Sequence, residues 1–329
     1  MVSEATIDKL KGMWYGLFIG DALGASTEFK EKGEFEPITH YTQGVHPIPP
    51  GSWTDDGTMA LCIAHSFRVP ETRGGEFDFS PIRQLTQYYL WMTQGHHSIN
   101  SEVFDIGSIT KASIRVWARD KSVENPGVIG ELSQGNGSII RLAPVIIWGT
   151  LKEMTPFAIT EYAGLSSTTT HGHRACIDAC RYLSIILNQS IHNTPDFLTA
   201  FSSRNHLYQS VHQLKPLFSS IHAIAELTSI EAEYECNPSG YVVDTLKCAL
   251  RACRSHEHSA DRFATTLLSV ANEGGDADSI GAVAGQIIGT RLGFEEISKT
   301  ALYQDLRGKW MIEAGWRELL VAGGRRDLL

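Results

Sequence analysis

The chain has 329 residues, of which 42% are hydrophobic and 20% are charged, as is ordinary for a soluble globular protein. Its formal net charge of -9 argues against a broad electrostatic attraction to nucleic acid. The N-terminus lacks the basic and apolar regions of a signal peptide, and no apolar run reaches membrane-spanning length. We therefore expect a cytoplasmic protein that does not enter a membrane.

Helical periodicity dominates the sequence, and alternating strand-like runs are scarce. No linker or low-complexity stretch divides the chain. We therefore predict an all-α fold built as one domain over residues 1–329. Apolar residues recur at three- and four-residue spacing in the segments 6–25, 57–68, 80–94, 108–119, 138–152, 172–188, 241–254, 260–272 and 279–292. The segment 189–238 shows only scattered helical fragments, and we expect it to influence access of the target.

Two of the predicted helices carry a glycine at every fourth position. The first stripe lies within residues 12–24 and the second within residues 281–293. A glycine inside a helix costs about 0.5–1 kcal/mol relative to alanine, so eight of them at this spacing indicate a structural reason. A glycine stripe is a shallow groove that lets another helix backbone come close. We infer that the two helices meet in the centre of the fold and bring the ends of the chain together.

Two acidic clusters about 220 residues apart each precede one of the helical runs. Each cluster combines two carboxylates with a hydroxyl, and oxygen ligands of this kind suit hard divalent cations such as Mg²⁺ or Mn²⁺. If the fold joins the clusters, the carboxylates would repel one another strongly without cations between them. The clusters are Thr54-Asp55-Asp56 and Asp276-Ala277-Asp278-Ser279.

The same residues are also preferred helix caps, because Thr, Asp and Ser side chains accept hydrogen bonds from the first backbone N–H groups. A cap needs only one short polar side chain, whereas each cluster supplies three. The doubled pattern therefore favours a metal site, and the two roles are compatible.

Three further segments are candidates for chemistry. Gly135-Asn136-Gly137-Ser138 is expected to lead into a helix, where free N–H groups form an anion site, with Arg141 adding charge. Asn-Gly is also a common turn dipeptide. Glu28 follows the first glycine stripe and, taken alone, is compatible with a solvated loop residue. His171 stands before a helix, where a cap or a core hydrogen bond is the alternative to catalysis.

The six cysteines include no Cys-x-x-Cys pair. Most of them lie among apolar residues, so buried reduced thiols are favoured over a zinc site.

In this order the motifs resemble the ADP-ribosylglycohydrolase family, and within it the bacterial branch that acts on ADP-ribosylated dinitrogen reductase. The resemblance extends from residue 12 to about residue 293, and several of its pieces are individually weak. The matching segments are Gly-Asp-Ala-Leu-Gly-x-x-x-Glu (20–28), Trp-Thr-Asp-Asp (53–56), Asp-Ile-Gly (105–107), Gly-Asn-Gly-Ser…Arg…Pro (135–144), Thr-His (170–171), Ser-Gly-Tyr-Val-Val-Asp-Thr-Leu (239–246) and Gly-Gly-Asp-x-Asp-Ser (274–279).

This resemblance implies a single orthogonal helical bundle with a binuclear Mg²⁺ or Mn²⁺ centre in a cleft. The implied ligands are Thr54, Asp55, Asp56, Asp276, Asp278 and Ser279. The family more often has Thr at the position of Ser279, but the hydroxyl is kept.

The resemblance also implies roles in catalysis and substrate binding. Glu28 matches a catalytic acid near the metals, with Asp55 or Asp56 as the base for water. Asp105 matches an acid near the leaving group, and Tyr241 a residue beside the nucleotide. The diphosphate is implied to lie against residues 135–138, near His171.

The implied activity is metal-dependent hydrolysis of ADP-ribose from arginine on a modified protein, with ADP-ribose as the product. Two alternatives stay open. The linkage is instead to serine, a nucleobase or O-acetyl, or the protein acts by binding, as an immunity protein against an ADP-ribosylating toxin.

Overall fold

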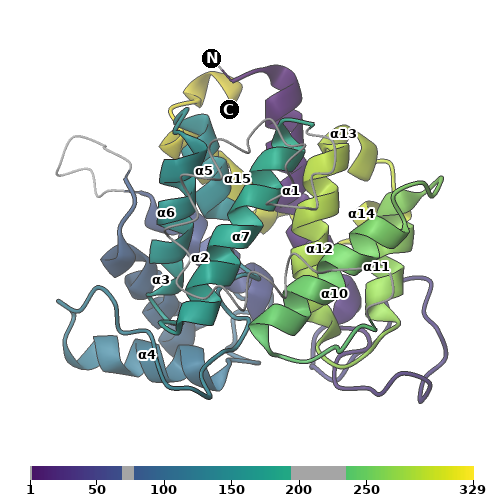
Figure 1. The fold of residues 1–329 in the computed structure, drawn as a ribbon, viewed down its shortest axis with the longest axis horizontal. Coiled ribbons are helices and arrows are strands. Elements are labelled where there is room, and N and C mark those ends of the chain that lie inside the picture. Colours follow the sequence, from purple (N-terminus) through teal and green to yellow (C-terminus); the bar gives the residue numbers. More distant parts are fainter. Residues whose placement is uncertain (1, 69–77, 194–234) are drawn as a thin grey trace.

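The computed structural model describes residues 2–68, 78–193 and 235–329 (Figure 1). Over these residues it is helical, with two isolated bridges and no sheet, so the predicted all-α fold is confirmed. The α-helices are α1 (Glu4–Gly24), α2 (Asp55–Ser66), α3 (Pro81–Gln94), α4 (Ser108–Arg119), α5 (Ala143–Leu151), α6 (Pro156–Ser167), α7 (Arg174–Ile191), α10 (Val242–Ser255), α11 (Arg262–Ala271), α12 (Ala277–Leu292), α13 (Phe294–Ile297), α14 (Ala301–Asp305) and α15 (Lys309–Ala322).

The centre of the molecule is a seam between α1 and α12, which lie alongside each other in Figure 1. A Cβ atom added at Gly16 would lie 2.1 Å from the carbonyl oxygen of Gly285, and one added at Gly20 would lie 1.9 Å from that of Gly281. The backbones are therefore in direct contact, and any side chain would push the helices apart. The inferred meeting of the two glycine stripes is confirmed.

The seam is antiparallel and brings the end of α1 to the start of α12. A Cβ atom added at Gly24 would lie 2.2 Å from the carbonyl oxygen of Ala277, the first residue of α12. The start of α2 is fixed nearby, because the Asp21 carboxylate of α1 accepts a hydrogen bond from the Gly57 backbone N–H at 2.8 Å. Both acidic clusters therefore begin their helices at the same end of α1.

Several helix boundaries differ from the sequence prediction. The helix expected from residue 138 begins at Ala143, because Gly135 pairs with Tyr241 in an isolated bridge and the chain then turns until Pro144 enters the first helical turn. Helices α6, α13, α14 and α15 were not predicted. Helix α15 packs on α1, where Trp14 Nε1 donates a hydrogen bond to the carbonyl oxygen of Ile312 at 2.8 Å.

The cysteine prediction is wrong for one pair. Cys236 and Cys248 form a disulfide, while the other four cysteines are free and buried. Cys236 lies in the extended segment before α10, and the second turn of that helix directs Cys248 back toward it, with a Cα–Cα distance of 5.0 Å. The sequence carries no signal for this pairing, since the partners are 12 residues apart across a loop and a helix.

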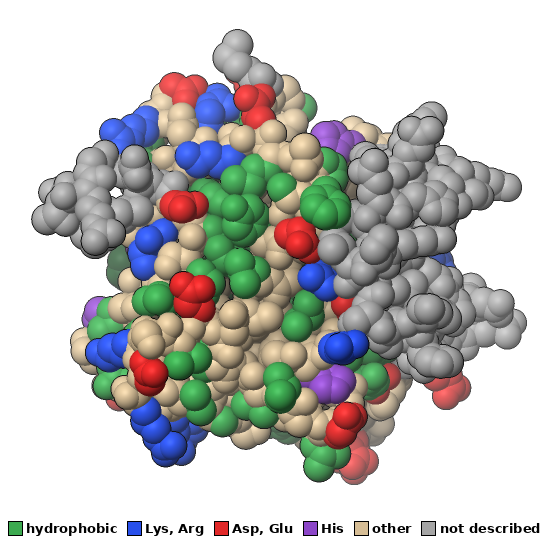
Figure 2. Space-filling view, turned by 60° about the vertical axis from the view of Figure 1, so that its left-hand side comes forward, with side chains coloured by type: hydrophobic (Ala, Val, Ile, Leu, Met, Phe, Trp, Pro, Cys, Tyr) green, Lys and Arg blue, Asp and Glu red, His purple; other side chains and the backbone are tan. Residues whose placement is uncertain are grey.

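No described helix is both long and apolar enough to cross a lipid bilayer. On the face shown in Figure 2, the described Lys and Arg side chains are interspersed with Asp and Glu side chains, and they form no broad basic surface there. Most of the segment 189–238, for which a role in target access is expected, lies outside the described residues.

We predict that Gly16→Ala destabilises the protein. Elsewhere in a helix this change is favourable by about 0.5–1 kcal/mol, but here the new Cβ meets the Gly285 carbonyl and the helices must separate. Overpacking of this kind costs about 1–3 kcal/mol, which urea unfolding monitored by circular dichroism measures.

Gly130→Ala is the matched control, because an added Cβ there meets only the Ser133 hydroxyl, at 3.5 Å. A Gly16→Ala protein as stable as the wild type would show that the seam tolerates a side chain and would contradict this packing.

Candidate active site

A cleft of about 520 Å³ lies at the end of the α1–α12 seam. It brings together most of the residues singled out in the sequence. Those that line it are Glu28, Asp55, Asp56, Asp105, Gly135, Asn136, Gly137, His171, Asp276, Asp278 and Ser279.

The acidic clusters do not act as helix caps through their side chains. Neither Thr54 nor Asp276, the residues at the cap positions of α2 and α12, makes a side-chain capping hydrogen bond. Asp21 of α1 holds the start of α2 instead, accepting hydrogen bonds from the Thr54 backbone N–H at 2.9 Å and hydroxyl at 3.0 Å. The Thr54 hydroxyl also lies 3.4 Å from Asp278 Oδ2, which links the two clusters directly.

The grouped oxygen atoms fit a divalent cation. Glu28, Asp276 and Asp278 place carboxylate oxygens within 4.8 Å of one another. Among the described residues, the buried Asp56 Oδ2 and Asp278 Oδ1 atoms have no hydrogen-bond partner. Buried polar atoms are nearly always satisfied in proteins, so these oxygens are suited to a ligand. A dense set of carboxylates with free lone pairs is what hard cations bind.

The electrostatics of the acids agree with this fit. Burial, and after it the charge of neighbouring carboxylates, raises the pKa values of Asp55, Asp56 and Asp278 well above their usual range. Burial also raises the pKa of Glu28 to about 7, against the opposing effect of its hydrogen bond to His46. Ionising these groups together is therefore costly unless positive charge enters the cleft.

Gly135, Asn136 and Gly137 line the cleft beside the acids and form what we call its facing wall. The Gly135–Ser138 loop does not start a helix as expected, because α5 begins only at Ala143. Its Asn136 side chain donates hydrogen bonds to Asp276 Oδ2 at 2.6 Å and to the Thr245 hydroxyl at 2.9 Å. Asn136 thus orients one of the acids.

His171 lies directly beneath this loop. A Cβ atom added at Gly137 would lie 2.7 Å from the His171 ring. Burial, and after it the charge of Arg141, lowers the pKa of His171 to about 3, so the imidazole is neutral. Its Nδ1 atom lies 2.8 Å from the Thr170 hydroxyl. The remaining nitrogen, Nε2, faces the loop.

Four of the singled-out residues do not line the cleft: Thr54, Ser138, Arg141 and Tyr241. Arg141 is buried, its guanidinium packs over the Tyr88 ring, and it donates a hydrogen bond to the Thr170 hydroxyl at 2.5 Å. It therefore supports His171 from behind. Ser138 is buried, whereas Tyr241 is 38% exposed and lies in a neighbouring hollow beside Gly135. Tyr241 therefore flanks the cleft without lining it.

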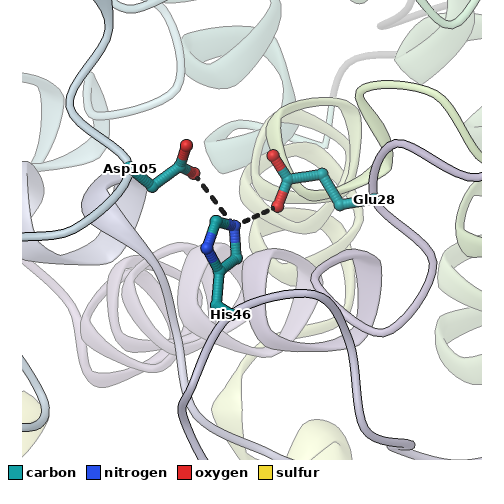
Figure 3. Close-up of side chains that lie close together, drawn as sticks. All are labelled: Glu28, His46 and Asp105. Carbon is teal, nitrogen blue, oxygen red and sulfur yellow. Dashed lines mark hydrogen bonds and ion pairs between the residues drawn. The ribbon is translucent and has the colours of Figure 1, made fainter.

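Sequence reasoning missed His46, which lies between two of the acids (Figure 3). Its Nε2 atom is 2.7 Å from Glu28 Oε2 and 3.4 Å from Asp105 Oδ2. Hydrogen bonds with Asp105 and Glu28 raise the pKa of His46 to about 10, so the ring is an imidazolium at neutral pH. It also missed the role of Asp21, although the Gly-Asp-Ala-Leu-Gly motif contains that residue.

We predict that the metal-free protein loses stability as the pH rises. An acid whose pKa is raised by folding contributes stability that is fully present below its unfolded pKa and is lost as the pH rises through its folded pKa. For Glu28 that window runs from its ordinary value of 4.5 to about 7. In EDTA, the free energy of unfolding should therefore be higher at about pH 5.5 than at about pH 8, as measured with urea.

Asp278→Asn removes one of the buried charges and should reduce this loss, whereas Asp120→Asn, on the surface, should leave it unchanged. A free energy of unfolding that is the same at both pH values in EDTA would show that folding does not raise the pKa values of these acids.

Comparisons with known proteins identify the family of the chain. A model of the ADP-ribosylglycohydrolase family matches residues 2–326. The chain is 31% identical over 294 residues to the ADP-ribosylarginine hydrolase Tri1 of Serratia proteamaculans (strain 568), covering 89% of this chain and 74% of that protein. It is 26% identical over 308 residues to the ADP-ribosyl-(dinitrogen reductase) glycohydrolase of Rhodospirillum rubrum, covering 90% of each.

The fold is similar to a solved structure described as an ADP-ribosylglycohydrolase-related protein complex. The TM-score is 0.74 at 27% identity, and the similarity covers 98% of this chain and all of the other chain.

Proposed function

The chain belongs to the ADP-ribosylglycohydrolase family, and we propose that it hydrolyses the N-glycosidic bond between ADP-ribose and an arginine side chain of a modified protein. The observation that carries the proposal is the joining of both acidic clusters with Glu28 and Asp105 in one cleft, which a glycine-rich loop also lines. The similarity to an ADP-ribosylarginine hydrolase supports the arginine linkage. A guanidinium group is cationic, and carboxylates are its strongest hydrogen-bond partners.

In this proposal the hydroxyls and carboxylates of both clusters hold two cations, Mg²⁺ or Mn²⁺. When bound, such cations orient ribose hydroxyls and lower the pKa of a water molecule. The proposed ligands are Thr54, Asp55, Asp56, Asp276, Asp278 and Ser279.

Each acidic side chain of the cleft has its own role in the proposed reaction. Asp55 or Asp56 accepts a proton from the attacking water, whose oxygen bonds to ribose C1″. The bond from C1″ to the guanidinium nitrogen breaks, and its electron pair stays on that nitrogen. Glu28 orients the ribose, and Asp105 accepts hydrogen bonds from the N–H groups of the departing guanidine.

The facing wall is proposed to hold the other half of the substrate. The backbone of residues 135–138 and the neutral His171 ring suit the diphosphate, because neither adds negative charge. Tyr241 flanks this wall and is proposed to contact the nucleotide. For Arg141 we now propose support of His171 in place of contact with phosphate.

Other parts of the account stay predictions. They are the single domain over residues 1–329, the cytoplasmic location, the choice between Mg²⁺ and Mn²⁺, and any counterpart among ADP-ribosylating toxins.

We predict that the purified protein releases ADP-ribose from an arginine-modified protein and that EDTA abolishes the release. Asp56→Ala should reduce kcat by at least about 100-fold, because it removes a group that is proposed both to accept a proton and to bind metal. Chromatographic detection of free ADP-ribose measures the rate.

The surface variant Asp120→Ala should retain the wild-type rate. A serine-linked substrate, tested in parallel, identifies the linkage, and activity on it alone would replace arginine with serine. Undiminished release in EDTA would refute the role of metal.

A further inference from the structure

The segment between α1 and α2 places one imidazole, that of His46, directly behind two acids that line the cleft. The carboxylates of Glu28 and Asp105 converge on His46 Nε2, one from each side of that nitrogen (Figure 3). Among the described residues, His46 is the one side chain with a hydrogen bond to the Glu28 carboxylate, at 2.7 Å. Glu28 itself is only 2% exposed, so water contributes little to holding it.

The backbone around His46 is anchored on the end of α1. A Cβ atom added at Gly44 would lie 1.9 Å from the Ala25 carbonyl oxygen, so the loop backbone rests directly on that helix end. The Ser26 hydroxyl accepts a hydrogen bond from the Thr42 backbone N–H at 3.0 Å. The Gln43 side-chain amide donates to carbonyl oxygens on both sides of the turn, including that of His46 at 3.0 Å. His46 is therefore presented by a fixed turn.

Two phenylalanines confine the imidazole ring. The Phe104 and Phe29 ring centroids lie 5.4 Å and 6.2 Å from that of His46. Phe29 has φ +61, which is rare for a bulky residue, and its backbone N–H donates to the Gly275 carbonyl oxygen at 2.8 Å. The left-handed turn at Phe29 thus fixes the chain directly after Glu28 and sends the aromatic ring to the rim of the cleft.

Without His46, the Glu28 carboxylate would face only acids. Asp276 and Asp278 place carboxylate oxygens within 4.8 Å of it, and like charges at this distance repel. The side chain of Glu28 would then rotate away from the cleft. A displacement of about 1 Å in a group that contacts substrate is enough to cost about 100-fold in rate.

We propose that His46 is a positioning residue, whose Nε2–H group holds the Glu28 carboxylate in the cleft and ties it to Asp105. The inference rests on the proposed function, in which Glu28 orients the ribose and Asp105 faces the leaving group. His46 contacts Glu28 and Asp105 but not the loop 135–138 or His171, so its loss should affect turnover much more than binding of the ADP-ribose half.

Two variants separate the hydrogen bond from the packing of the ring. His46→Phe keeps an aromatic ring between Phe29 and Phe104 but removes the donor, whereas His46→Gln keeps an N–H donor and removes the ring. We expect His46→Phe to lower kcat by about 10- to 100-fold, and His46→Gln to stay within about 5-fold of the wild type. The dissociation constant of ADP-ribose, from calorimetry, should change by less than about 3-fold in both.

His40→Gln, in the same segment but on the surface, is the control and should match the wild type. A role in packing alone predicts the opposite order, with His46→Phe active and His46→Gln impaired, and that order would overturn the inference. A parallel rise in the ADP-ribose dissociation constant in both variants would overturn it as well.

Crystal structures of the two variants make the test independent of activity. The Glu28 carboxylate should face Asp278 in the wild type and in His46→Gln, and should turn away in His46→Phe. If the wild-type protein releases no ADP-ribose from any substrate, the proposed function fails, and the orientation of Glu28 still decides the inference. An unchanged Glu28 in His46→Phe would overturn it.

Discussion

Backbone contact between α1 and α12 is the interaction on which the candidate site depends. Glycine weakens a helix by about 0.5–1 kcal/mol per residue, yet both helices carry one in each turn of their shared seam. The gain is proximity: at the end of the seam, Gly24 lies against Ala277. Carboxylates encoded about 220 residues apart in the sequence can therefore meet only if these helices lie in contact.

The acids are held in place by neighbours with no direct part in the proposed chemistry. Asp21 accepts hydrogen bonds from the Thr54 and Gly57 backbone N–H groups at the start of α2 and from the Thr54 hydroxyl, which also lies 3.4 Å from Asp278. Asn136, in the loop of the facing wall, donates a hydrogen bond to the Asp276 carboxylate and so fixes its orientation. The two walls of the cleft are thus coupled through hydrogen bonds to the acids. Such supporting contacts keep the oxygen atoms aimed inward at the cost of strong mutual repulsion.

The parts predicted from sequence are those with a local signature. The glycine stripes indicated the seam, and the doubled acidic clusters indicated a shared site, because both patterns depend on residue type and spacing alone. Arg141 was misplaced because it was assigned to a helix that begins later, at Ala143. His46 lies in an irregular segment, where no periodicity fixes the direction of a side chain. The disulfide of Cys236 likewise depends on how a loop returns to a helix.

We propose that the seam assembles one cation centre from both clusters. Electron paramagnetic resonance of the full chain titrated with Mn²⁺ tests it most directly, because two ions about 3.5–4 Å apart are magnetically coupled. We expect binding of two Mn²⁺ per chain with a coupled signal, which Asp278→Asn converts to the signal of an isolated ion. Uncoupled ions in the wild-type protein, or binding unaffected by Asp278→Asn, would contradict it.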